Sequence, residues 1–242
     1  MRAAVCIAGQ PRQFKVGYEY LAASLADYDV DYFTHIWYNK DDCGKTLKAY
    51  SKKDPFIADI VTHNTDVDFL DLYNPKSHII EKQIDFDKDI DLENNHGLSP
   101  STVQPSEIFL SMIYSRWCAV QLLQRYLARA DTDYDIVICT RTDFCPLTKL
   151  NYKDLHDQSI YFAYVPGTEW NTTCINDVFA ISKSLDVIIH FGSLWKTYIE
   201  LFNNGSVYCP HKLLMAQMKQ CKLGTIFNKH WRLARSHGLS TS

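Results

Sequence analysis

Short apolar runs alternate with longer amphipathic segments along this chain, and this alternation is what most limits the fold. Residues 2–8, "RAAVCIA", read as a buried strand, and Gly9 and Pro11 end it before an amphipathic segment over 14–25. Strands that alternate with helices pack as a largely parallel sheet with helices on its faces. The sequence therefore predicts an α/β domain with a Rossmann-type, mostly parallel central sheet flanked by helices.

The same pattern continues to the end of the chain. Further strands are predicted at 30–38, 77–84 and 159–165 and from residue 136, with a short apolar run at 178–182 and helices over 106–131, 185–202 and 212–220. The helix over 106–131 is the most pronounced, because its apolar residues share one stripe. Residues 85–105 are acidic and then rich in Asn, Ser and Pro, which predicts a long flexible loop, and such loops are often lids.

Composition excludes several classes of protein. With 242 residues, 46% of them hydrophobic, the chain can bury the core of one large domain. A net charge of -3 argues against a protein that works by coating nucleic acid or an anionic membrane. The sequence contains no apolar run long enough to span a bilayer and no recognisable signal peptide, so we expect a cytoplasmic protein.

Eight cysteines are present, and they are expected to be reduced. Cys6, Cys118 and Cys139 lie within apolar segments of a chain without a recognisable secretion signal. No C-x-x-C pair and no H-x-x-x-H pair occurs in the sequence. A structural zinc site is therefore not expected.

Ligands of open α/β sheets bind outside the carboxyl ends of the strands, which directs attention to the loop "GQPRQF" after the first strand. Gly9 would let the backbone approach a ligand, while Gln10 and Arg12 provide donors. Arg12 could bind a phosphate with two hydrogen bonds. The alternative is a Gly-Gln-Pro turn that carries an ordinary surface arginine.

The second strand end, "IVICTRTDF" at 136–144, carries charge directly after a buried run. Buried ionic groups are costly unless they are paired or bound to something, so this end is predicted to face a ligand. Asp143 would hold Mn²⁺ or Mg²⁺ against a diphosphate, with Arg141 and Thr142 beside it. The alternative is an ion pair between Arg141 and Asp143.

The order "CIAGQPRQF", a long helix, "YDIVICTRTDF" and then "NDVFAIS" resembles the GT-A-fold nucleotide-sugar glycosyltransferases of polysaccharide gene clusters and large DNA viruses of algae. The resemblance implies one glycosyltransferase domain over 1–242, with a nucleotide-binding half over 1–105 and a metal and acceptor half over 106–242. In such enzymes an Asp-x-Asp motif after a central strand holds the metal. Arg141 stands at the first of these positions, which puts metal dependence in question.

The resemblance implies transfer of a sugar from a nucleoside diphosphate sugar, with a UDP-sugar favoured, to a hydroxyl of a glycan acceptor. Inversion would need a carboxylate near the acceptor oxygen, and Asp177 in "INDVFAIS" is the candidate base. Asn176 beside it would line the acceptor pocket. The alternative is that Asn176 and Asp177 form a turn into the next element.

Four other residues are weaker candidates. Glu169 and Trp170 would line the sugar or acceptor pocket, although a tryptophan also serves in simple packing. His211 and His230 would reach the diphosphate or the metal if the C-terminal segment folds back, the alternative being ordinary surface or core histidines.

Two other classes of function fit the same residues. One is a non-catalytic nucleotide- or glycan-binding module that has lost its metal motif. The other is a metal-dependent phosphohydrolase that acts on a nucleotide, but such an enzyme normally needs more clustered carboxylates than "TRTDF" provides.

Overall fold

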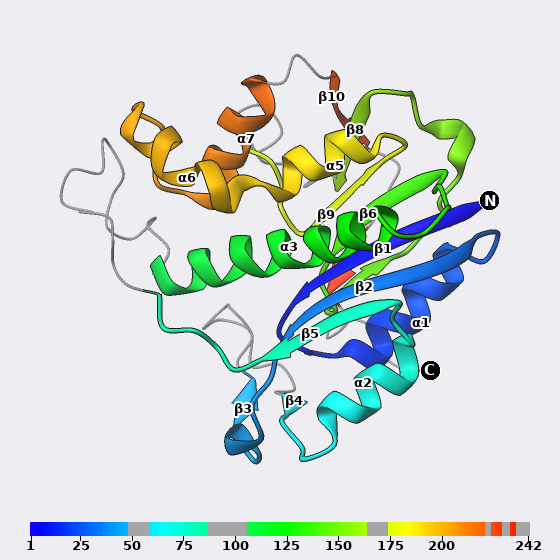
Figure 1. The fold of residues 1–242 in the computed structure, drawn as a ribbon, viewed down its shortest axis with the longest axis vertical. Helices are drawn as coiled ribbons and strands as arrows, with labels where there is room; N and C mark the ends of the chain where they lie inside the picture. The colour runs from blue at the N-terminus through cyan, green and yellow to red at the C-terminus, as the bar shows by residue number, and fades with distance from the viewer. Residues whose placement is uncertain (48–58, 87–105, 164–173, 221–223, 229–232, 236–242) are drawn as a thin grey trace.

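A computed structural model describes residues 1–47, 59–86, 106–163, 174–220, 224–228 and 233–235 (Figure 1). The helices are α1 (Phe14–Ser24), α2 (Thr65–Tyr73), α3 (Ser106–Leu127), α5 (Leu185–Gly192), α6 (Leu194–Asn203) and α7 (Pro210–Gln220), with short 3-10 helices η1 (Lys40–Asp42) and η3 (Tyr152–Asp154). The strands are β1 (Arg2–Gly9), β2 (Asp29–Trp37), β3 (Thr46–Leu47), β4 (Asp59–Ile60), β5 (Ser77–Glu81), β6 (Ile136–Thr140), β7 (Phe144–Pro146), β8 (Ser159–Ala163), β9 (Phe179–Ser182), β10 (Gly224–Asn228) and β11 (Leu233–Arg235).

Within these residues, seven strands form one sheet in the order β10-β8-β9-β6-β1-β2-β5. Strand β1 pairs in parallel with β2 and β6, β2 with β5, and β8 with β10. Strand β9 runs antiparallel to both β6 and β8. The predicted mostly parallel α/β architecture is therefore confirmed.

The sheet is covered on both faces, which explains why its strands read as continuous apolar runs. Helices α3, α5, α6 and α7 lie on one face, and α1 and α2 lie on the other (Figure 1). Along β1, Ala4 and Cys6 belong to the core beneath α3, whereas Ala3, Val5 and Ile7 belong to the core beneath α1. Successive strand residues point to opposite faces, so each face receives its own apolar layer.

The helix predicted over 185–202 was wrong as a single element, because the structure contains two helices, α5 and α6, that meet at Ser193. The Ser193 hydroxyl donates to the carbonyl of His190 at 2.8 Å, and the Gln217 side-chain amide of α7 donates to the Ser193 hydroxyl oxygen at 3.1 Å. These side-chain bonds compete with the helical backbone pattern and mark the break. Helix α2 was not predicted.

The polar residues singled out from sequence are brought to one edge of the sheet. Gly9 of β1 pairs with Ile36 of β2, and Thr140 of β6 pairs with Ile7 of β1, so these parallel strands end together. Strand β9 is antiparallel, and its first residue, Phe179, pairs with Thr140. The residues just before β9 therefore lie at the edge where β1 and β6 end.

Helix α1 crosses the turn after β6 at very close range. A Cβ atom placed on Gly17 would lie 1.8 Å from the backbone carbonyl oxygen of Thr142. Glycine is required here because backbone, unlike a side chain, cannot rotate out of the way.

We expect Gly17→Ala to destabilise the protein by at least about 1–3 kcal/mol, because the added methyl group forces α1 away from Thr142. Helix propensity alone gives the opposite sign, a gain of about 1 kcal/mol. Urea unfolding measures the difference, and Glu19→Ala at an exposed position of α1 is the control. A Gly17→Ala variant as stable as the wild type would contradict this packing.

Candidate functional site

The loop after β1, at the carboxyl edge of the sheet, begins at Gly9. Its φ of 117° is a backbone conformation that favours glycine. The Gln10 side-chain oxygen accepts hydrogen bonds from Arg12 Nε at 2.8 Å and from Arg12 Nη2 at 2.6 Å. The guanidinium is thus oriented by a neutral amide. Phosphate binding by Gly9, Gln10 or Arg12 stays a prediction.

Thr142 joins this loop to the turn after β6. Its hydroxyl lies 2.8 Å from the carbonyl oxygen of Gln10 and 2.9 Å from that of Arg12. The residue is buried, with 1% of its surface exposed. Thr142 therefore holds the two predicted phosphate loops together, and direct ligand contact by its side chain stays a prediction.

Arg141 and Asp143 form a bidentate ion pair. Arg141 Nε donates to Asp143 Oδ1 at 2.9 Å, and Nη2 donates to Oδ2 at 2.6 Å. The Arg141 guanidinium also lies over the ring of Phe144, 5.3 Å from its centre. The side chains are 26% and 10% exposed, so the pair is partly buried at the edge. This is the ion pair that the sequence left open as the alternative.

The described residues do not form a cluster of metal ligands around Asp143. They contain no cluster of three or more His, Cys, Asp or Glu side chains that could hold one. Mg²⁺ and Mn²⁺ can manage with one or two carboxylates plus phosphate and water, but both oxygens of Asp143 already accept from Arg141. Metal binding by Asp143 stays a prediction.

Asp177 lies in a buried ionic cluster. Arg116 of α3 donates through Nη2 to the Asp177 carbonyl oxygen at 2.7 Å and lies 3.2 Å from its Oδ2. His211 of α7 has its Nδ1 3.3 Å from Asp177 Oδ1 and 2.9 Å from the carbonyl oxygen of Ile175. The Arg116 guanidinium also lies over the Phe191 ring. The cluster thus connects α3, α7 and the start of β9.

Burial raises the pKa of Asp177, but the charges of His211, Arg116 and Arg141 outweigh it and leave the pKa below its usual value. The carboxylate is therefore ionised at neutral pH, yet its side chain is only 2% exposed. Asn176 accepts a hydrogen bond from the Val178 amide at 3.4 Å, as the predicted turn requires. The roles of Asp177 as base and of Asn176 as a pocket residue stay predictions.

Arg116 was missed by the sequence analysis, although the sequence contained a signal. It lies between Ile113 and Val120 on the buried side of α3, where a charged residue needs a partner. Its Nη1 is buried and has no hydrogen-bond partner among the described residues.

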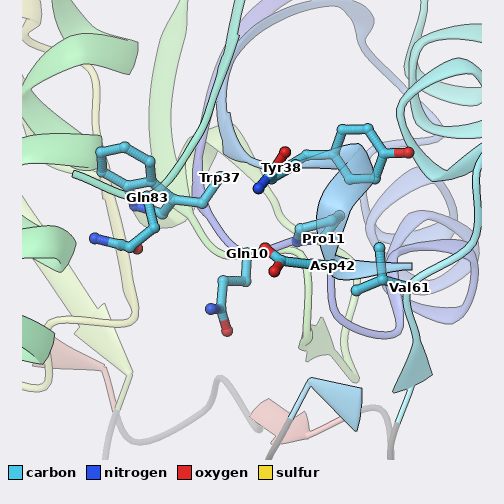
Figure 2. A pocket seen from close by; sticks show the side chains of 8 residues that line it. Gln10, Pro11, Trp37, Tyr38, Asp42, Val61 and Gln83 are labelled. Carbon is cyan, nitrogen blue, oxygen red and sulfur yellow. The ribbon is translucent and has the colours of Figure 1, made fainter. Parts of the chain in front are cut away.

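A pocket opens at the same edge, beside the loop after β1. It is lined by Gln10, Pro11, Trp37, Tyr38, Asn39, Asp42, Val61 and Gln83. Figure 2 shows Gln10, Pro11 and Asp42 between Trp37 and Gln83 on one side and Tyr38 and Val61 on the other. Trp37 is 4% exposed, and its indole nitrogen has no hydrogen-bond partner among the described residues. Only Gln10 of this set was predicted, because the other residues come from segments that the sheet brings together.

Three predicted site residues, Glu169, Trp170 and His230, lie outside the described residues. The C-terminal segment does fold back toward the site, as β11 pairs with β7 and places Arg235 opposite Phe144. His211 lies in the Asp177 cluster, and its contact with the diphosphate or the metal stays a prediction.

No protein-family profile matches this chain, and no curated protein matches it. Among solved structures, the chain is similar to the apo-form glycosyltransferase GlyE of Streptococcus pneumoniae TIGR4, with 10% sequence identity and a TM-score of 0.41. The alignment covers 93% of this chain and 44% of that chain, so this chain spans less than half the length of its neighbour. A similarity at this level does not identify an activity. In the described part of the chain, no helix has the length and apolar character needed to cross a membrane.

The lowered pKa of Asp177 predicts an acid-sensitive contribution to stability. A carboxylate with a depressed folded-state pKa stabilises the fold above its unfolded pKa of about 3.9, and this stabilisation is lost as pH falls through the folded pKa. We expect Asp177→Asn to cost on the order of 3 kcal/mol at pH 7, because Arg116 loses its buried partner.

The measurement is urea unfolding of wild type and Asp177→Asn between pH 3 and pH 7. The difference between the two proteins should shrink below about pH 4. Asp157→Asn, at an 83% exposed side chain, is the control and should leave stability nearly unchanged. A difference that is independent of pH would contradict the ionised state of Asp177.

Proposed function

We propose that this protein is a GT-A-type glycosyltransferase that moves a sugar from a nucleoside diphosphate sugar, with a UDP-sugar favoured, to a glycan hydroxyl. The observation that carries the proposal is the position of the pocket. It adjoins the Gln10 to Arg12 loop at the carboxyl edge, and Thr142 links that loop to Arg141 and Asp143. Open α/β sheets bind their ligands at this edge.

The pocket suits the base of a nucleotide. Its Trp37 indole N–H is a buried donor without a partner among the described residues, and a base carbonyl would satisfy it. Asn39 and Gln83 offer amide donors and acceptors, while Asp42 accepts only. Val61 and Pro11 supply apolar contact. A mixed set of this kind can recognise the edge and the face of a planar heterocycle.

The two arginines suit a diphosphate. When the bond from sugar to phosphate breaks, negative charge grows on the departing nucleotide, and guanidinium groups stabilise that charge. Arg12 follows Gln10 and Pro11, which line the pocket, so it is the proposed primary contact. Arg141 must share or release Asp143 to bind phosphate, so it is the proposed second contact.

The contacts of Asp177 favour a positioning role over the role of acceptor base predicted from sequence. A general base works best with a pKa near the operating pH, whereas the charges of His211, Arg116 and Arg141 outweigh burial and hold the pKa of Asp177 low. Its carboxylate instead fixes the start of β9 against α3. The predicted acceptor residues Glu169 and Trp170 keep their proposed place in the sugar or acceptor pocket.

A binding module without catalysis is the second candidate. The observation in its favour is that Asp143, the predicted metal ligand, and Asp177, the predicted base, both contact cationic side chains. Neither is arranged to act as a base. A module of this kind would bind nucleotide or glycan in the same pocket and transfer nothing. A phosphohydrolase would need a cluster of metal ligands, which the described residues do not provide.

The deciding experiment combines binding and turnover. Thermal shift with UDP, GDP and a panel of nucleotide sugars, with and without Mn²⁺, identifies the donor, since a ligand that binds the native state raises the melting temperature. Incubation of that donor with glycan acceptors and mass analysis of the products then tests transfer. Binding without transfer would favour the module, and the absence of any nucleotide response would contradict both the glycosyltransferase and a nucleotide-binding module.

Arg12→Ala should weaken UDP binding by about one to two decades, because a charge-assisted hydrogen bond contributes roughly 1.5–3 kcal/mol. Preference among UDP-sugars should not change, since a phosphate contact does not touch the sugar. Calorimetry provides the affinities. Lys15→Ala removes an exposed cation three residues away and is the matched control. Equal affinity in Arg12→Ala and the control would remove Arg12 from the site.

Asp143→Asn distinguishes between two roles of Asp143, that of a metal ligand and that of the ion-pair partner of Arg141. If Asp143 restrains Arg141, the variant releases the guanidinium and should bind UDP several-fold more tightly in EDTA. Wild-type affinity should then be the same with Mn²⁺ as with EDTA. Calorimetry in both buffers is the test. A Mn²⁺-dependent gain in the wild type that Asp143→Asn abolishes would instead establish the metal role.

A further inference from the structure

A cysteine and a histidine meet beside the pocket but do not line it, on the segment between β2 and α2. Cys43 Sγ lies 3.1 Å from His63 Nδ1. Cys43 directly follows η1, and His63 lies in the turn before α2. The thiol is half-buried and the histidine is exposed, so solvent and small reagents reach the pair.

Backbone hydrogen bonds hold the two residues in place. The Gly44 amide donates to the Val61 carbonyl at 2.8 Å, and the Val61 amide donates to the Lys45 carbonyl at 3.0 Å. The Tyr38 hydroxyl lies 3.1 Å from the carbonyl oxygen of His63. The two segments that carry Cys43 and His63 are therefore tied together beside the contact, which holds the sulfur within hydrogen-bond distance of the imidazole.

Other thiols in the described residues lack this environment. Cys6, Cys118, Cys139 and Cys174 are buried, and burial raises the pKa of Cys118 to about 11. Cys209 is half-buried like Cys43, but burial raises the pKa of its thiol. Thiolate is the reactive form of cysteine, so these thiols are poor nucleophiles at neutral pH.

Charged side chains of both signs surround Cys43. Asp42 precedes it and forms an ion pair with Lys45 at 2.6 Å, and Asp41 also acts on Lys45. Burial, and after it the charges of Asp66 and Cys43, raise the pKa of the Tyr38 hydroxyl to about 12. The three carboxylates oppose a thiolate at Cys43, while Lys45 favours it. His63 is the side chain whose nitrogen lies within hydrogen-bond distance of the sulfur.

We propose that Cys43 and His63 form a reactive thiolate–imidazolium pair, and that Cys43 is the site where this protein undergoes exchange with small disulfides. The Cys43 thiolate attacks one sulfur of the reagent, RSSR, forming a Cys43–SR bond while the RS–SR bond breaks. The departing RS⁻ carries away the electron pair and takes a proton from solvent. Cys43 is oxidised, and the released half of the reagent is reduced.

The expected gain in rate is modest because two effects oppose each other. A thiol with an ordinary pKa of about 8.5 is roughly 3% thiolate at pH 7, whereas one with a pKa of about 7 is half ionised. The nucleophilicity of each thiolate falls as its pKa falls, by about fivefold over this interval. The net acceleration at pH 7 is then about threefold, so the pH at half-maximal rate is the sharper readout.

The test uses the full chain with Cys145→Ser and Cys221→Ser, which removes the two cysteines whose side chains the structure does not describe. Dithiodipyridine is added at pH 5–10, the released thione is followed by absorbance, and the modified residue is identified by peptide mass. We expect Cys43 to react first, with half-maximal rate below pH 8. First modification elsewhere, or a midpoint at or above pH 8.5, overturns the proposal.

His63→Asn keeps a hydrogen-bonding side chain but cannot become a cation. Its midpoint should rise toward pH 8.5, and its rate at pH 7 should fall about threefold. His78→Asn, at an exposed histidine on β5, is the matched control and should behave like wild type. Circular dichroism checks the fold of each variant. If His63→Asn and His78→Asn have the same midpoint as wild type, the imidazole does not activate Cys43.

Discussion

The hydroxyl of Thr142 is the contact on which the arrangement of the sheet edge depends. It lies within hydrogen-bond distance of two carbonyl oxygens of the loop after β1, and the Thr142 carbonyl in turn meets Gly17 of α1. Residues more than 100 positions apart in sequence are thereby fixed side by side. Without this contact, Arg12 and Arg141 would sit on two independent loops, and their separation would not be set.

A second anchor lies deeper, where Arg116, Asp177 and His211 meet between α3, β9 and α7. Buried charges lose hydration, and their mutual attraction compensates for this loss only when the geometry is good and the remaining donors are satisfied. Arg116 fulfils part of this condition through the Asp177 carbonyl and the Phe191 ring. A cluster of this kind specifies one packing of α3 on the sheet more firmly than apolar contact does, because a shifted helix would leave a charge unpaired.

The sheet could be predicted from sequence because its signals are local. Each strand is a short apolar run ended by glycine, proline or charge, and residues 136–140 are buried as their composition requires. The break at Ser193 could not be predicted, since it depends on Gln217 of a helix that follows. Helix α2 was missed because its alternation of acidic and apolar residues, "TDVDFLDLY", lacks a continuous apolar stripe.

The residue types of the candidate site could be predicted from sequence, but the choice between alternative partners could not. Arg141 and Asp143 directly after β6 indicate charge at the edge, but whether that charge faces a ligand or a neighbour depends on side-chain rotamers. The pocket could not be predicted, because Trp37 and Gln83 are brought together by the parallel pairing of β2 and β5, and Val61 by its backbone bonds to Gly44 and Lys45.

The pairings also bear on how an anion would enter. At this edge Arg141 faces a carboxylate in a bidentate pair, which an incoming phosphate would have to displace. Displacement exposes a second anion next to the phosphate, and like charges in a partly buried site repel strongly. A diphosphate would therefore bind beside the pocket first and engage the β6 turn in a second step, as Asp143 moves away or is neutralised. Since Thr142 fixes the two loops, that second step must come from the side chains and not from the backbone.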